Sequence, residues 1–324
     1  MSKLLDIFIN HWTEPWEVGR DALNMLAAQR RVDWENIGVA IIHDGQYGFP
    51  DEYFADYPFH VEQVYLPHKG ISAARNWAID HSNATWIKFC DFDDTFAGVF
   101  SLSCILDALP NCKKYDLMWF PLIVDMYEGN QLILYNSPVF IHDKIFRRSF
   151  LKRENIRFNE TLYYSEDFAF SSVIKMVLNP LKIGKIETNF PIYVYVQRMG
   201  SINNTPELWV KNKTGLFMAH SYIESELRKR GLWKEADIMV ARTMAECLFV
   251  VLSAGNSIDI SDFINRVMAF YNEHKECIVN TTNEIWDYVV NMTNNQNLSD
   301  FTRDDVLAWI QQLDGGTVNE REDQ

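Results

Sequence analysis

Apolar and polar residues follow two different periods along the first 200 residues of the chain. Short β-branched and aromatic runs, typical of strands, alternate with segments in which apolar residues recur at helical spacing. The predicted strands are residues 4–9, 36–42, 60–66, 85–90, 116–126, 131–135 and 190–196. The predicted helices are residues 15–29, 71–81, 144–153 and 166–178. This alternation predicts a doubly wound α/β sheet that is flanked by helices.

The pattern changes after residue 205, where apolar residues recur only at helical spacing. The predicted helices there are residues 206–230, 238–252, 261–271, 283–292 and 302–313. Gly231 is expected to stop the first of them, and Ser261 and Thr302 are expected N-caps. We therefore predict an α/β domain over residues 1–204 and a helical region over residues 205–324. Within the helical region, residues 314–324 are expected to have no fixed structure.

Composition narrows the class of protein. The chain has 324 residues, is 48% hydrophobic and carries a net charge of −14. It is long enough to bury a sizeable core. Its net negative charge opposes sequence-independent binding to nucleic acid, which needs a basic surface. The five cysteines have no metal-finger spacing, and their odd number favours free thiols. The sequence shows neither a signal-peptide pattern nor an apolar run of membrane-spanning length, so we expect a cytoplasmic protein without a transmembrane segment.

The segment IKFCDFDDTF, residues 87–96, begins as a buried strand and ends on the carboxylates Asp91, Asp93 and Asp94. Three unpaired charges are costly to bury. Asp91 and Asp93 are two residues apart, so at a strand end their side chains would lie on one face. Two carboxylates on one face suit Mg²⁺ or Mn²⁺, bound together with the phosphates of a substrate. The alternative is a turn in which aspartates cap backbone groups.

A second candidate precedes this strand in PHKGISAARNWAID, residues 67–80. A loop at Gly70 leads into a helix whose first turns carry Arg75 and Asn76. A helix N-terminus with a nearby cation suits a phosphate group. The alternative reading of these two residues is a solvated helix face.

Four segments, in this order, resemble the family-2 nucleotide-sugar glycosyltransferases of the GT-A fold. They are LDIFINHWTEPWEVGRDALNMLAAQ, then GISAARNWAID with DFDD, then DKIFRRSFLKRENIRFNETLYYSEDFAF, and then YVYVQRMGSI. The resemblance spans residues 3–204 and implies a GT-A domain, Rossmann-like, with a mixed sheet. It also implies a metal-dependent, inverting transfer of a hexosyl or pentosyl group from a nucleotide-diphosphate sugar to an acceptor hydroxyl. Mn²⁺ or Mg²⁺ is the implied cofactor.

The resemblance assigns roles on the donor side. Asp44 would hold the base, with Trp12 against it, and Arg75 and Asn76 would face the nucleotide. The residues that would contact the nucleotide sugar are Trp12, Asp44, Arg75, Asn76, Asp91, Asp93, Arg198 and Ser201. Asp44-Gly45-Gln46 stands where the family usually has Asp-Gly-Ser. The identity of the nucleotide therefore stays open, with UDP as the first expectation.

On the reaction side, Asp91 would contact the ribose or the metal, and Asp93 would hold the metal. Arg198 and Ser201 would close over the diphosphate. Asp167 would be the catalytic base, and Glu166 beside it would orient the acceptor or the base. The chemistry requires these types, because a cation offsets the charge of the leaving diphosphate and a carboxylate must accept the proton of the acceptor hydroxyl.

The acceptors that the resemblance implies are cell-surface polysaccharides, lipopolysaccharide or lipid-linked glycans. A hydroxymethylated base of phage DNA is less favoured because of the net charge. Two alternatives are a non-catalytic sugar-nucleotide-binding protein, which the Asp-x-Asp and Glu-Asp motifs oppose, and a nucleotidyltransferase. The latter needs a glycine-rich phosphate loop after the first strand, and INHWTEPWEVG supplies none. The helical region is expected to shape the acceptor site or to form a homo-oligomer interface.

Overall fold

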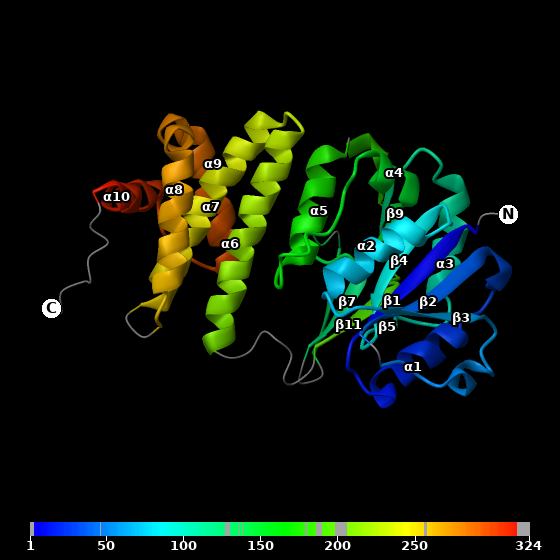
Figure 1. Ribbon diagram of the computed structural model, residues 1–324. Coiled ribbons are helices and arrows are strands. Elements are labelled where there is room, and N and C mark those ends of the chain that lie inside the picture. Colours follow the sequence, from blue (N-terminus) through cyan, green and yellow to red (C-terminus); the bar gives the residue numbers. More distant parts are fainter. Residues whose placement is uncertain are drawn as a thin grey trace. The chain divides into compact units, whose positions relative to one another are not determined.

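The computed structural model of the chain describes residues 3–45, 47–126, 130–135, 137, 139–178, 180–185, 190–197, 206–255 and 258–315 (Figure 1). The chain forms two compact units, Met1–Ser201 and Ile202–Gln324. The strands belong to the first unit, and the long helices α6 to α10 belong to the second. The predicted boundary between residues 204 and 205 falls outside the described residues and stays a prediction.

The larger sheet of the first unit is mixed. Its strands, in spatial order, are β10 (Ile183–Lys185), β6 (Leu117–Trp119), β9 (Lys144–Arg147), β4 (Trp86–Asp91), β1 (Leu5–His11), β2 (Ile37–Asp44) and β3 (Val61–Leu66). β1 to β4 are parallel, whereas β9 runs antiparallel to both β4 and β6. Asn10 pairs with Asp91, and His11 pairs with His43, so these strand ends meet at one edge of the sheet. Ligands bind at this edge in α/β sheets.

The chain enters a second, smaller sheet directly after β4. Its strands, in order, are β5 (Thr95–Phe96), β11 (Tyr193–Val196), β7 (Leu122–Met126) and β8 (Asn130–Leu134). The chain leaves the larger sheet at Asp91 and enters the smaller one at Thr95. The acidic cluster, which is Asp91, Asp93 and Asp94, therefore lies where the backbone passes from one sheet to the other.

Helices cover the strands of this unit. They are α1 (Trp16–Ala27), α2 (Ile71–His81), α3 (Ser101–Ala108), α4 (Arg148–Arg153) and α5 (Glu166–Val177). β1 and β2 are buried almost throughout, which is why they appear in the sequence as continuous apolar runs. Leu23 and Leu26 of α1 pack with Ile7 and Ile41 in one core. These contacts fix the strand ends on which the polar residues lie.

The second unit is helical, as predicted. Its helices are α6 (Pro206–Lys229), α7 (Trp233–Ala254), α8 (Ser261–Asn280), α9 (Asn283–Asn297) and α10 (Arg303–Asp314). Helix α7 contacts the other four helices. The second unit has an apolar core of its own, to which Val240 of α7 and Trp286 of α9 belong. Thr302 caps α10 as expected, but Ile260 rather than Ser261 precedes α8, because Asp259 accepts the bonds of the Ser261 amide and hydroxyl. Within the described residues, no helix combines the length and the apolar character that crossing a membrane requires.

Two predicted elements of the first unit are wrong. The predicted helix over residues 144–153 is strand β9 followed by the short helix α4, because Lys144–Arg147 pairs with β4 and β6. The predicted strand over residues 116–126 is divided at Pro121 into β6 and β7, which belong to different sheets. Long-range pairing decides both cases, and local periodicity carries no information about it.

Candidate active site

The acidic cluster is a turn between two strands. β4 ends at Asp91, and Asp94 donates its amide to the Asp91 carbonyl at 3.2 Å across the turn. Asp93 lies in this turn and not in the strand. The expectation that Asp91 and Asp93 share one face of a strand is therefore wrong in its geometry, since the alternation of side chains stops at Asp91.

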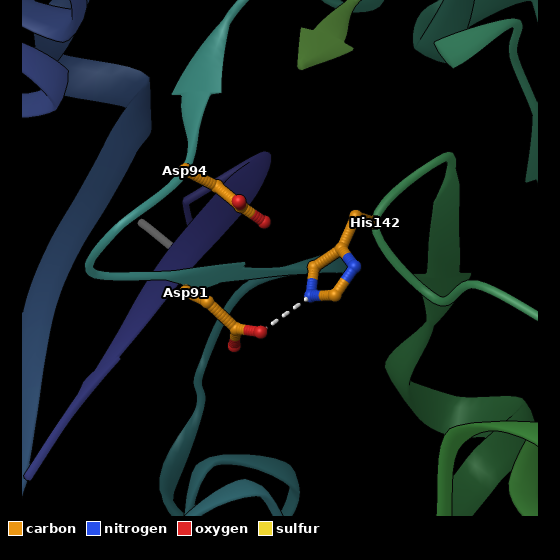
Figure 2. A group of neighbouring side chains, drawn as sticks. All are labelled: Asp91, Asp94 and His142. Atoms are coloured by element: carbon orange, nitrogen blue, oxygen red, sulfur yellow. Dashed lines mark ion pairs between the residues drawn. The ribbon is translucent and has the colours of Figure 1, made fainter. Parts of the chain in front are cut away.

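The structure instead brings Asp91 and Asp94 together with His142, which precedes β9 (Figure 2). One ligand atom from each residue lies within 4.8 Å of the others. Nε2 of His142 is 3.1 Å from Oδ2 of Asp91. Oδ2 of Asp94 is buried and has no hydrogen-bond partner among the residues that the structure describes. Two carboxylates and an imidazole can hold a divalent cation, and this mixed oxygen and nitrogen set suits Mn²⁺ better than Mg²⁺.

Burial and charge shift the pKa values of these three groups. Burial raises the pKa of Asp94 to about 8, against the opposing charge of His142 and with the help of Asp91 and Asp93. Burial alone would also raise the pKa of Asp91, but His142 and Arg75 hold it well below its usual range. The pKa of His142 is raised by Asp91 in spite of its burial. Burial therefore favours the protonated form of Asp94.

Arg75 connects this cluster to the predicted catalytic residues. Its guanidinium is 1% exposed and lies among three carboxylates. Nη2 is 3.2 Å from Asp91, and Nη1 is 3.1 Å from Glu166 and 2.6 Å from Asp167. Arg75 therefore contacts the protein's own acids, and its predicted contact with a nucleotide stays a prediction. Helix α2, strand β4 and helix α5 meet through this one side chain.

Glu166 and Asp167 form the first turn of α5. Ser165 before them has a positive φ of 61°, which is uncommon outside glycine and which directs the chain into the helix. Burial raises the pKa of Glu166 to about 7, and the neighbouring charge of Asp167 adds to the shift, while Arg75 opposes it. A carboxyl group with a pKa near neutrality is suited to accept a proton in catalysis.

Asn76 holds the segment that leads to α5. Its Nδ2 donates to the Phe158 carbonyl and to Oε1 of Glu160, each at 2.9 Å, and its Oδ1 accepts from the Phe158 amide at 2.9 Å. These buried bonds tie α2 to residues 158–160. They give no support to the predicted contact between Asn76 and the nucleotide.

Asp44 and Trp12, the predicted base contacts, are connected through His68. Asp44 accepts hydrogen bonds from the Lys69 amide at 2.8 Å and the Gly70 amide at 2.9 Å, and its Oδ2 is 2.8 Å from Nδ1 of His68. Trp12 stacks on His68 with ring centroids 5.1 Å apart and planes 6° from parallel. Asp44 therefore fixes the loop before α2, and the exposed Trp12–His68 pair offers a flat aromatic surface.

The remaining predicted site residues, Arg198 and Ser201, lie outside the described residues. His142 was missed by the sequence analysis because the segment after it was interpreted as a helix. A strand there, antiparallel to β4, would have carried His142 to the end of β4 beside Asp91.

The sequence comparison agrees with this geometry. Residues 7–159 match the model of glycosyl transferase family 2. Residues 7–159 therefore form a glycosyl transferase family 2 domain, which makes up somewhat less than half of the chain. The predicted family, enzyme class and fold class are thereby confirmed: this is a glycosyltransferase with a GT-A domain and a helical C-terminal region. No curated protein sequence matches the chain significantly.

Solved structures of the same fold are known. The crystal structure of S. aureus TarS 1–349 has a TM-score of 0.65 and 14% identity, over 97% of this chain and 92% of that one. Its complex with UDP has a TM-score of 0.64 and 14% identity, over 99% and 94% of the two chains. The complex with UDP-GlcNAc has a TM-score of 0.61 and 16% identity, over 97% and 92%. At these identities the likeness concerns the fold alone.

Replacing Arg75 by Met is expected to lower the free energy of unfolding by about 3–5 kcal/mol, because three partly buried carboxylates lose the buried cation that they share. Urea unfolding measures the change. The matched control is Arg157→Met, whose partly exposed partner is Asp80, with an expected loss of about 1 kcal/mol or less. Equal losses in both variants would contradict the role given to Arg75.

The raised pKa of Glu166 predicts a pH dependence of stability. Between its ordinary value of 4.5 and its folded value of about 7, the folded protein keeps a proton that the unfolded chain has released. The free energy of unfolding therefore falls as pH rises through this window. Urea midpoints at pH 5 and pH 8 should show a smaller fall for Glu166→Gln than for the wild type. Glu52→Gln, at an exposed carboxylate, should retain the wild-type fall, and an identical fall in Glu166→Gln would refute the assignment.

Proposed function

We propose that this glycosyltransferase is metal-dependent and inverting, and that it transfers a sugar from a UDP-sugar to an acceptor hydroxyl. The proposal rests on one observation: Arg75 bonds to two separate groups of carboxylates at the same time. Asp91 belongs to the candidate cation site, Glu166 and Asp167 belong to the candidate base, and one guanidinium bonds to all three. A leaving diphosphate and an attacking hydroxyl need these two groups side by side.

The donor side fits a nucleotide diphosphate. The exposed Trp12–His68 stack provides a surface on which a base can lie. Asp91, Asp94 and His142 would hold the cation, with Asp93 as the further ligand that the family resemblance implies. Once bound, the cation would offset the charge that develops on the leaving diphosphate. The UDP and UDP-GlcNAc complexes of the structurally similar TarS support a UDP-sugar as the donor.

On the acceptor side, a carboxylate takes the proton of the attacking hydroxyl. A single base opposite the leaving group gives one displacement and inversion at the anomeric carbon. Asp167 is the base by family resemblance, and Arg75 fixes its Oδ1 at 2.6 Å. Glu166, with its pKa raised to about 7, is the competing candidate. The proposed acceptors remain surface polysaccharides, lipopolysaccharide or lipid-linked glycans, and the helical unit remains the proposed acceptor-site or homo-oligomer element.

The donor and cation are tested by calorimetry with UDP in Mn²⁺ and in EDTA. We expect UDP to bind much more weakly in EDTA, and Asp91→Asn and Asp94→Asn to remove the benefit of Mn²⁺. Asp107→Asn, at an exposed position of α3, should leave that benefit intact. Asp93→Asn decides whether the turn residue is also a ligand. Equal UDP affinity with and without Mn²⁺ would overturn the proposed metal dependence.

The base is tested by comparing Asp167→Asn with Glu166→Gln. We expect Asp167→Asn to bind UDP and Mn²⁺ normally but to transfer sugar about 10²–10⁴-fold more slowly, since an amide cannot take the proton. Glu166→Gln is expected to lose less. Transfer of a UDP-sugar to any acceptor that the wild type uses provides the rate, and NMR of the product's anomeric proton gives the stereochemistry. The reverse order of rates would make Glu166 the base, and a retained anomeric configuration would exclude the single displacement.

A further inference from the structure

Lys88 is a fully buried lysine in the middle of β4, three residues before Asp91. Burial lowers the pKa of Lys88, and the charges of Cys90, Asp143, Asp94 and Asp91 oppose the shift. Burying a charged side chain in a central strand costs desolvation free energy, and the chain neighbours Ile87 and Phe89 are apolar and equally buried. The cost requires a compensating interaction, and the contacts of the ammonium group show which one it is.

The strongest contact of Lys88 is to the residue that carries the candidate cation ligand. Its Nζ donates to the His142 carbonyl at 2.7 Å and makes a longer bond of 3.4 Å to the Phe89 carbonyl. The ammonium also lies over the ring of Tyr193, 4.3 Å from its centroid. Two acceptors and an aromatic face thus stabilise the charge in the interior.

The position of this bond in the sheet explains why a side chain is needed. The pairing of β4 with β9 joins Trp86 to Arg147 and Ile87 to Phe146, and it ends there. His142 precedes β9 and lies beyond the last of these pairs. Beyond this last pair, the side-chain hydrogen bond from Lys88, the next residue of β4, joins β4 to the segment before β9 in place of a backbone hydrogen bond.

Tyr193 provides a second connection between the two residues. The imidazole of His142 stacks on the Tyr193 ring, with centroids 5.3 Å apart and planes 7° from parallel. The Tyr193 hydroxyl accepts a hydrogen bond from the Asp91 amide at 3.0 Å. Lys88 therefore contacts both the backbone of His142 and the ring against which its imidazole lies.

We propose that Lys88 is a positioning residue that holds His142 beside Asp91, so that the imidazole is placed as the third ligand of the cation site. The part that concerns the cation rests on the proposed function, whereas the placement of His142 does not. Lys144 anchors the earlier part of the same segment through the carbonyls of Ser137 and Phe140. Loss of Lys88 should therefore disturb His142 locally and leave the segment attached.

Lys88→Met keeps the length of the side chain and removes the donor. Titration of Mn²⁺ into the full chain should show about 10–100-fold weaker binding in this variant, the usual effect of losing an outer partner of a metal ligand. In the His142→Ala background the same change should have no further effect, because Lys88 acts through His142. A loss of equal size in both backgrounds would overturn the proposal.

A second measurement needs no metal. In ¹⁵N spectra of the histidine rings, the His142 signals are identified by their loss in His142→Ala. They should move in Lys88→Met towards those of an imidazole without a neighbouring carboxylate, because Nε2 would no longer be held 3.1 Å from Asp91, and unchanged signals would overturn the proposal. The matched control is Lys3→Met, which removes a bond of 2.9 Å to the Ile37 carbonyl at the other end of the strands and should leave the His142 signals in place.

The outcomes separate the two proposals. A wild type that binds neither Mn²⁺ nor UDP contradicts the proposed function, and the ring signals of His142 still decide the role of Lys88. If Lys88→Met does not fold, Lys88→Leu provides the second neutral variant, with the same expected movement of the signals and the same contradicting result.

Discussion

The site depends on one guanidinium that is shared among three carboxylates. Without Arg75, the negative charges of Asp91, Glu166 and Asp167 would repel one another in a largely buried setting. The planar, always charged Arg side chain can donate to several acids at once, which a lysine cannot do in the same geometry. Helix α2, strand β4 and helix α5 therefore have to pack so that their acids converge on this group. This requirement sets the distance between Asp91 and the pair of Glu166 and Asp167.

The second constraint is the passage of the chain from the larger sheet to the smaller one. Asp91 ends a strand of the first, and Asp94 precedes a strand of the second. Oδ1 of Asp94 accepts the Val196 amide of β11 at 2.9 Å, and Tyr193 of the same strand supports Asp91. The smaller sheet thus holds the carboxylate of Asp94 and the backbone amide of Asp91. The acidic turn has a definite shape because two sheets hold its ends.

The sequence predicts the parts of this arrangement that depend on local pattern. The apolar runs of β1, β2 and β4 and the helical spacing of α2 and α5 place Asp91 at the end of a strand, Arg75 within a helix and Asp167 at the start of another helix. It does not predict contacts that arise from long-range pairing. Lys144–Arg147 directly precedes the helix α4 and forms strand β9 because β4 and β6 flank it, and this pairing brings His142 to the site. The contact of Lys88 cannot be predicted from local pattern for the same reason, since its hydrogen-bond partner is the carbonyl of His142, 54 residues away along the chain.

Burial and charge together explain the protonation of the site. Arg75 bonds to Asp91, Glu166 and Asp167, while Asp94 lies with Asp91 beside His142 and near the buried ammonium of Lys88. Burial raises the pKa of Asp94 to about 8 and that of Glu166 to about 7, and neighbouring carboxylates add to both shifts. Burial thus favours the protonated form of one acid in the turn after β4, Asp94, and of one acid at the start of α5, Glu166. A divalent cation held by Asp91, Asp94 and His142 would displace the proton of Asp94, because a carboxylate binds a cation in its deprotonated form.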